Sequence, residues 1–130
     1  MAYNRETDDH CFVCGTANPC GLQLRFKADG GKVAASFTSS AAHQGYKGLV
    51  HGGILASILD EAMIQAALLR GLSPVTAELS VRFTSPLRVG ERARVEAEIV
   101  TGGTRLLKAA ARLFGADGGA IAEAQAKLIV

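Results

Sequence analysis

Hydrophobic and polar residues alternate with a period of two over six segments of the chain. Such alternation is typical of a strand that buries one face. Glycine-rich turn signals separate several of the segments, which favours antiparallel hairpins. The Ala-rich last two segments would also suit a helix by propensity, but the Gly-Gly turns before them favour strands. The predicted strands are residues 21–28, 32–38, 75–86, 91–100, 105–115 and 120–130.

Residues 52–70 depart from this pattern and read GGILASILDEAMIQAALLR. Their apolar positions keep the 3.6-residue period of a helix and extend onto its other faces, which predicts a largely buried helix. Asp60 and Glu61 are its only charges before Arg70. Gly71 suits a C-terminal cap, so we expect the helix to end there.

The predicted element order is two strands, one helix and four strands. One buried helix with six antiparallel strands indicates an α+β fold, in which a curved sheet wraps around the helix. A length of 130 residues predicts a single domain, residues 1–130. The polar and charged residues 1–10 are expected to form a mobile tail.

Composition and charge argue against several classes of protein. The net charge is only +2 and the basic residues are scattered, which disfavours nucleic-acid binding. The first ten residues hold no apolar segment and no run of 18 apolar residues occurs, so we expect no signal peptide and no membrane span. Three cysteines, an odd number, disfavour a disulfide framework, and a reducing cytoplasm fits best.

The start of the predicted helix carries candidate chemistry in His51, Gly52 and Gly53. Backbone N–H groups at a helix N-terminus lack partners and favour negative charge, and glycine lets a ligand carbonyl approach closely. Asp60 lies further along this apolar helix, where a charge is costly. A donor for an oxyanion, together with a carboxylate that activates water or attacks a carbonyl carbon, can hydrolyse a thioester.

Spacing adds a constraint on assembly. Eight residues separate Gly52 from Asp60, which is roughly 12 Å along a helix axis. The two residues of one helix therefore cannot reach the same carbonyl group. If both act on one substrate, Gly52 of one subunit must meet Asp60 of another, as a two-fold dimer with antiparallel helices would allow. We expect a homodimer or a dimer of dimers.

Three segments resemble a known family. HGGILASILDEAM, residues 51–63, is similar to the helix signature of hotdog-fold thioesterases of the phenylacetate-degradation type. CFVCGTANPCGLQLRF, residues 11–26, resembles the C-x-x-C-G-x-x-N-P-x-G-L segment of a bacterial branch of that superfamily. VTAELSVRFTSPLRVGE, residues 75–91, resembles the strand after the helix and its P-x-x-x-G-E turn. The resemblance implies a hotdog fold and an acyl-CoA thioesterase without a cofactor.

Roles follow from the resemblance at matching positions. Asp60 would be the nucleophile or the general base, and the Gly52 N–H would polarise the thioester carbonyl. His51 would hydrogen-bond near the site or orient its loop. Thr76 matches a hydroxyl that positions the attacking water.

Further residues are candidates for substrate contact. Some relatives carry Asn six residues before the His, where this chain has Gly45, and Gln44 is a possible substitute. Gly53 adjoins the proposed oxyanion donor. Glu61 follows the proposed nucleophile directly, although about 100° round the helix, so it should face elsewhere. Arg82 is one of several basic residues that could meet the phosphates of CoA.

Each candidate also has a structural interpretation. Asp60 could be a carboxylate that hydrogen-bonds across a dimer interface. His51 and the two glycines could serve only as the entry to the helix. Thr76 could be an ordinary strand residue, and Arg82 a solvated surface charge.

His10, Cys11, Cys14 and Cys20 offer ligand types that suit zinc. No second clear pair accompanies the Cys-x-x-Cys, so we interpret the segment as a loop with partly buried thiols and expect no metal. A redox function is disfavoured because no helix clearly starts at Cys11.

The preferred function is hydrolysis of aryl- or fatty-acyl-CoA to free acid and CoA. An acyl-CoA or small-ligand binding protein without catalysis is the main alternative, because fold does not dictate function. A hydratase ranks lower, since no second helix-borne acid–base motif is visible. A zinc-stabilised interaction module would require bound metal.

Overall fold

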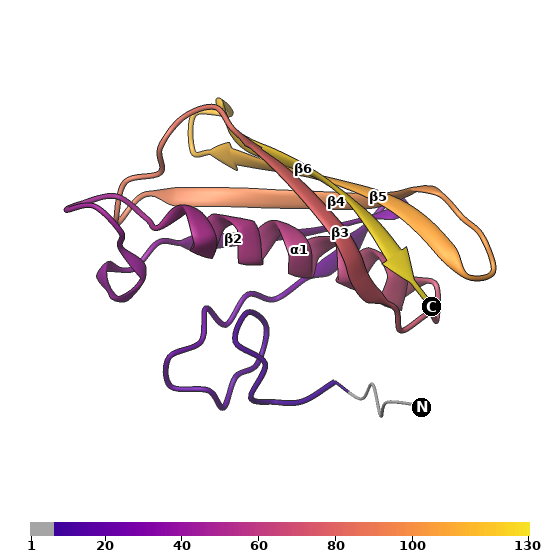
Figure 1. Ribbon diagram of the computed structural model, residues 1–130. Coiled ribbons are helices and arrows are strands. Elements are labelled where there is room, and N and C mark those ends of the chain that lie inside the picture. Colours follow the sequence, from indigo (N-terminus) through magenta and orange to yellow (C-terminus); the bar gives the residue numbers. More distant parts are fainter. Residues whose placement is uncertain (1–6) are drawn as a thin grey trace.

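A computed structural model describes residues 7–130. Six antiparallel strands form one sheet, which curves around a single long helix (Figure 1). The spatial order is β1-β2-β4-β5-β6-β3. This arrangement confirms the α+β architecture expected from the alternating pattern. Residues 1–6 of the expected tail lie outside the described residues.

The strands and the helix fall close to the predicted segments. A short 3-10 helix, Ala41–His43, lies in the loop before the long helix. The elements are β1 (Lys27–Asp29), β2 (Lys32–Thr38), α1 (Gly52–Leu69), β3 (Val75–Phe83), β4 (Arg92–Thr101), β5 (Leu106–Gly115) and β6 (Ala120–Ile129).

The first predicted strand, residues 21–28, is largely wrong, because β1 holds only its last two residues and Asp29. Gln23 interrupts the extended chain with a φ of 54°, in the left-handed region. The backbone N–H of Leu24 instead donates to the Val13 carbonyl at 2.9 Å. Leu24 is buried, as the alternation of apolar residues predicts. It is buried because this segment packs against the cysteine-containing loop, and not because it pairs in the sheet.

The hairpin between β1 and β2 follows the predicted turn. Asp29 pairs with Lys32 across Gly30 and Gly31, whose φ angles are 58° and 87°. Two central residues with positive φ match the right-handed twist of the flanking strands, which explains glycine at both positions.

Helix α1 packs one face against the concave side of the sheet (Figure 1). Leu59, Ala62 and Met63 are fully buried there. By length and composition alone the helix could cross a membrane, but a core helix of a soluble protein meets the same criterion. The helix packs against five strands of the sheet, as a core helix does.

The C-cap lies one residue before the predicted position. Arg70 is the C-cap, and Gly71 follows with a φ of 77°. The N–H of Gly71 donates to the Leu68 carbonyl at 2.9 Å, and the N–H of Leu72 donates to the Ala67 carbonyl at 3.1 Å. These two bonds form a Schellman motif, which satisfies carbonyls that the helix leaves unpaired.

Within residues 7–130, strand β3 forms one edge of the sheet and pairs only with β6. Its side chains include exposed Val75, Leu79 and Phe83. An unpaired edge that carries apolar residues is a surface on which another strand can add.

Candidate active site

The structure brings two predicted site residues into contact. The Thr76 hydroxyl Oγ1, from β3, donates a hydrogen bond of 2.6 Å to Oδ1 of Asp60, from the middle of α1. Both residues are half-buried. Oδ2 of Asp60 accepts no hydrogen bond from residues 7–130, so one carboxylate oxygen is held and the other is available.

A β-bulge accounts for this contact. Simple alternation would place Thr76 on the same sheet face as Glu78 and Ser80. The register of β3 against β6 shifts between Thr76 and Glu78, with Ala77 as the extra residue. Thr76 therefore lies opposite buried Leu128 and faces the helix. The predicted alternation is wrong at this end of the strand, and the bulge is what delivers the hydroxyl to Asp60.

His51 caps the start of α1. Its ring Nδ1 accepts a hydrogen bond of 2.8 Å from the Gly53 N–H, with the His51 backbone extended at φ −60° and ψ 134°. The N–H of Gly53 is thus occupied by the cap, whereas the N–H of Gly52 has no partner among the described residues. Of the two glycines, Gly52 is the one left to donate to a ligand.

Phe83 lies beside this free N–H, and sequence reasoning missed it. A Cβ added at Gly52 would stand 3.7 Å from Cζ of Phe83, at the end of β3. The Phe83 side chain is 51% exposed. An exposed aromatic ring next to an unpaired backbone donor can carry the apolar part of a ligand whose carbonyl reaches the donor. The signal was an aromatic residue at the last position of an alternating strand.

Gln44 does not reach the candidate site. Its side-chain Oε1 accepts from the Gly48 N–H at 3.2 Å, so it closes its own loop. A Cβ at Gly45 would stand 3.1 Å from the His51 Cα, so a larger residue there requires the loop to shift. The space beside Gly45 is therefore filled by the capping histidine.

Glu61 faces the N-terminal loop, away from Asp60, as its helical position predicts. Its Oε1 accepts from the Cys14 thiol at 3.2 Å and from Nε2 of Gln65 at 3.0 Å. Burial raises the pKa of the Cys14 thiol, and hydrogen bonding with Cys11 and with Glu61 raises it further. Glu61 therefore holds the loop on the helix.

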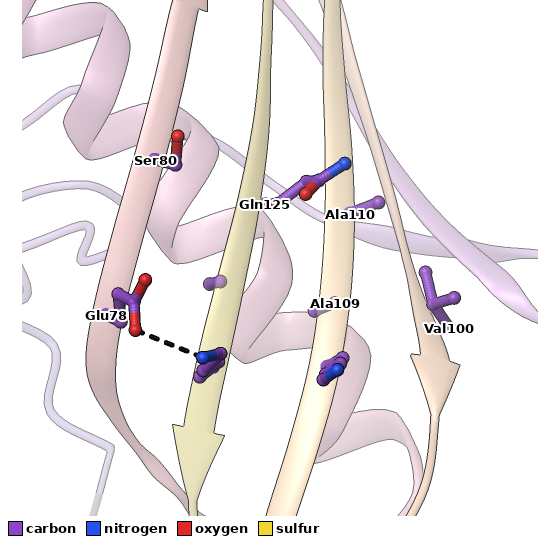
Figure 2. Close-up of a pocket in the computed structure, with 9 residues that line it drawn as sticks. Glu78, Ser80, Val100, Ala109, Ala110 and Gln125 are labelled. Carbon is purple, nitrogen blue, oxygen red and sulfur yellow. Dashed lines mark ion pairs between the residues drawn. The ribbon is translucent and has the colours of Figure 1, made fainter.

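Arg82 lies on the sheet face opposite to α1. It pairs in register with Glu123 of β6, and it lines a groove with Ser80 and Gln125. An adjoining groove of about 250 Å³ lies on the same face, with the helix behind the strands (Figure 2). An ion pair of 3.3 Å joins Glu78 and Lys127 across it. Neither groove is lined by Asp60 or by Gly52, which lie on the helix side.

The sequence profile of the thioesterase superfamily matches residues 47–122, more than half of the chain. The chain belongs to the thioesterase superfamily. The matched region includes His51, Gly52, Asp60 and Thr76, together with β3, β4 and β5. A search of curated proteins finds no significant match.

Solved structures of thioesterases share the fold of this superfamily member, which confirms the predicted hotdog architecture. A crystal structure of a thioesterase superfamily protein superposes with a TM-score of 0.89 at 25% identity, over 94% of this chain. The match covers 61% of that protein, so this chain spans less than two thirds of its length.

Three further structures are similar at lower identity. A hypothetical thioesterase from Streptococcus pneumoniae, crystallised with coenzyme A, gives a TM-score of 0.78 at 19% identity over 82% of this chain and 87% of that one. A phenylacetic acid degradation-related protein from Ralstonia eutropha gives a TM-score of 0.75 at 24% identity, over 84% of this chain and 86% of that one. A Streptococcus mutans protein of the same fold is bound to acetyl-CoA, with a TM-score of 0.78, 17% identity, and coverage of 82% and 87%.

Proposed function

We propose that this protein hydrolyses acyl-CoA thioesters to the free acid and CoA, with Asp60 as nucleophile or general base. The observation that carries the proposal is the hydrogen bond of 2.6 Å from Thr76 to Asp60. It holds one carboxylate oxygen on a half-buried helix and leaves the second oxygen for water or for the thioester carbon. The hydroxyl acts as a positioning group for this carboxylate.

The unpaired Gly52 N–H supplies the second group that the reaction needs, a hydrogen-bond donor for the thioester carbonyl oxygen. A developing oxyanion is stabilised by a donor that is already oriented, and the positive end of α1 adds to this effect. The His51 cap keeps the first turn in place at Gly53, so the helix start is ordered before the substrate arrives.

The ligands and the substituted residues of related structures support this assignment. The Streptococcus proteins were crystallised with coenzyme A and with acetyl-CoA. For the pneumococcal protein, crystal structures exist with an aspartate or with a threonine replaced by alanine, and these positions lie 16 residues apart. Asp60 and Thr76 have the same separation. The segments at residues 11–26 and 51–63 lead us to propose the phenylacetate-degradation type, with aryl- or fatty-acyl-CoA as substrate.

The active unit in this proposal is a homodimer or a dimer of dimers. Gly52 and Asp60 of one chain are separated by roughly 12 Å of helix, so one substrate needs Gly52 from one subunit and Asp60 from the other. The open edge of β3, with Leu79 and Phe83 exposed, provides a surface for the second subunit. A cytoplasmic location is proposed, because all three cysteines are free.

The decisive experiment measures thiol release from a panel of aryl- and fatty-acyl-CoAs by wild type and by Asp60→Asn. We expect turnover of at least one substrate class and a fall in kcat of about 100-fold or more in the variant. Asp117→Asn is the matched control, because Asp117 lies exposed in the β5–β6 turn and keeps its acceptor for the Gly119 N–H.

Two outcomes would contradict the proposal. Turnover that Asp60→Asn leaves unchanged would remove Asp60 from the chemistry. Saturable binding of acyl-CoA with no thiol release from any member of the panel would identify a binding protein on the same fold.

A further inference from the structure

A cluster of metal-ligating side chains lies apart from the Asp60–Thr76 pair. It joins the N-terminal loop to α1, because Cys11 and Cys14 come from the loop and Glu61 from the helix. One ligand atom from each of the three residues lies within 4.8 Å of the other two. The sequence alone offered only the Cys-x-x-Cys, and the fold adds the carboxylate from a position 47 residues further along than Cys14.

The spacing of these atoms suits a small tetrahedral cation. Zinc binds thiolate sulfur at about 2.3 Å and carboxylate oxygen at about 2.0–2.2 Å, which places tetrahedral sulfur and oxygen ligands roughly 3.5 Å apart. Sγ of Cys14 lies 3.2 Å from Oε1 of Glu61. The thiol proton now lies between these two atoms, so a cation would replace it with only a small movement of either side chain.

The surrounding groups already donate to the ligand atoms. The backbone N–H of Cys14 donates to Sγ of Cys11 at 3.4 Å. Nε2 of Gln65 donates to Oε1 of Glu61 at 3.0 Å and lies 3.7 Å from Sγ of Cys14. Hydrogen bonds of this kind orient the ligands of metal sites and stabilise their charge.

The loop is shaped so that both sulfurs face the helix. The Gly15 N–H donates to the Cys11 carbonyl at 2.9 Å and closes the turn. A Cβ at Gly15 would stand 2.3 Å from the Asp9 carbonyl oxygen, so only glycine fits. Cys20 is exposed and is not among the clustered ligands.

One side of the cluster is open to solvent. Cys11, Cys14 and Glu61 line a pocket of about 360 Å³, together with Ile64 and Pro74. A cation held by three protein atoms would therefore have its fourth position free for water on the pocket side. Three protein ligands with one open position is a coordination that zinc adopts in proteins.

We propose that Cys11, Cys14 and Glu61 form a binding site for Zn²⁺, which pins the N-terminal loop to α1. Binding replaces the two thiol protons, which are released to solvent, and forms two Zn–S bonds and one Zn–O bond. Two thiolates select a soft or borderline cation over Mg²⁺ or Ca²⁺. The site is independent of the proposed thioester hydrolysis, because none of its ligands contacts Asp60 or Thr76 among the described contacts.

The test uses the full chain, reduced and freed of metal with a chelator, and titrated with Co²⁺ and then with Zn²⁺. We expect one equivalent of Co²⁺ to produce thiolate-to-cobalt charge-transfer absorption and tetrahedral d–d bands, and Zn²⁺ to bleach both. Cys14→Ser should remove the part of the charge-transfer absorption that comes from the Cys14 sulfur, and it should weaken Zn²⁺ binding at least about tenfold. Glu61→Gln should weaken binding by a similar factor and leave the sulfur bands in place.

Cys20→Ser is the matched control, since it removes a thiol outside the cluster and should bind Co²⁺ as wild type does. Wild type that takes up no stoichiometric Co²⁺ or Zn²⁺ would overturn the proposal, whichever variants fold. Binding that is unchanged in Cys14→Ser, or that is lost in Cys20→Ser, would overturn it as well. Circular dichroism of each variant shows that a lost signal reflects a lost ligand and not unfolding.

Discussion

At the scale of single residues, the candidate site depends on a hydroxyl that orients a carboxylate. Thr76 donates to only one oxygen of Asp60, and it does so from a different element. A hydrogen bond to a charged group contributes about 1.5–3 kcal/mol, which is enough to decide the orientation of a side chain. The arrangement leads to a prediction about the hydroxyl itself.

Replacing Thr76 by Val removes the hydroxyl and keeps the β-branched shape. We expect kcat/KM for the best acyl-CoA to fall about 10- to 100-fold, because Asp60 loses the donor that orients it. Thr76→Ser keeps the donor and should retain most of the activity. The measurement is steady-state thiol release by both variants. Equal activity of the Val and Ser variants would exclude a role for the hydroxyl.

A second residue-scale prediction concerns Cys14 in the metal-free protein. Burial raises the pKa of its thiol, with added effects from Cys11 and Glu61, so the thiolate appears only at strongly alkaline pH. Because the thiolate is the reactive form, alkylation of Cys14 at about pH 8 should be at least about tenfold slower in the folded protein than in urea. Mass spectrometry of the peptide that carries Cys14 gives both rates.

Glu61→Gln removes a negative neighbour of the Cys14 thiol and should therefore speed this alkylation in the folded protein. A rate that is the same in the folded and unfolded chain would show that the thiol is not held as the contacts indicate.

At the scale of elements, local signals placed the helix and most strands correctly. The 3.6-residue period marked α1, and glycines marked the turn between β1 and β2 and the end of the helix. Two irregularities escaped these signals. Gln23 adopts a positive φ although it is not glycine, and Ala77 forms the bulge that turns Thr76 inward. Neither glutamine nor alanine is typical of such a conformation, so the sequence gives no signal for it. Tertiary packing imposes it.

Gly71→Ala tests the helix terminus. Gly71 has a φ of 77°, where a Cβ is unfavourable, so we expect a loss of about 1–2 kcal/mol in the free energy of unfolding. Gly102→Ala is a suitable control, because its added Cβ would meet only the Arg70 Nη1 at 3.5 Å, an ordinary contact. Urea denaturation of the two variants should separate them. A Gly71→Ala variant as stable as Gly102→Ala would contradict the Schellman assignment.

At the scale of the whole molecule, the helix holds the proposed oxyanion donor, Gly52, too far from the proposed catalytic carboxylate, Asp60, for both to act on one substrate within one chain. Gly52 and Asp60 can serve one substrate only across a subunit boundary, and β3 offers an unpaired apolar edge for that boundary. Sedimentation should therefore give a mass at least twice the 13.5 kDa of one chain.

Leu79→Lys places a charge on this edge and should shift the protein toward monomer, with loss of thioester hydrolysis. Val100→Lys, at an exposed position near the end of the central strand β4, should leave the dimer intact. A wild type that sediments as a monomer and still hydrolyses acyl-CoA would refute the shared site.

The sequence by itself determined where the helix and most of the strands lie, and hence the α+β fold with one central helix. Periodicity carries that information because burial of one face is a local property of a helix or a strand. It also singled out Asp60, Gly52, His51 and Thr76. Only the tertiary structure decided that Thr76 faces Asp60, that His51 occupies the Gly53 N–H and leaves that of Gly52 free, and that Glu61 meets Cys14. The Thr76–Asp60 and Glu61–Cys14 contacts depend on strand register and on residues distant in the chain, and the His51 cap depends on a ring orientation, none of which the pattern of apolar and polar residues records.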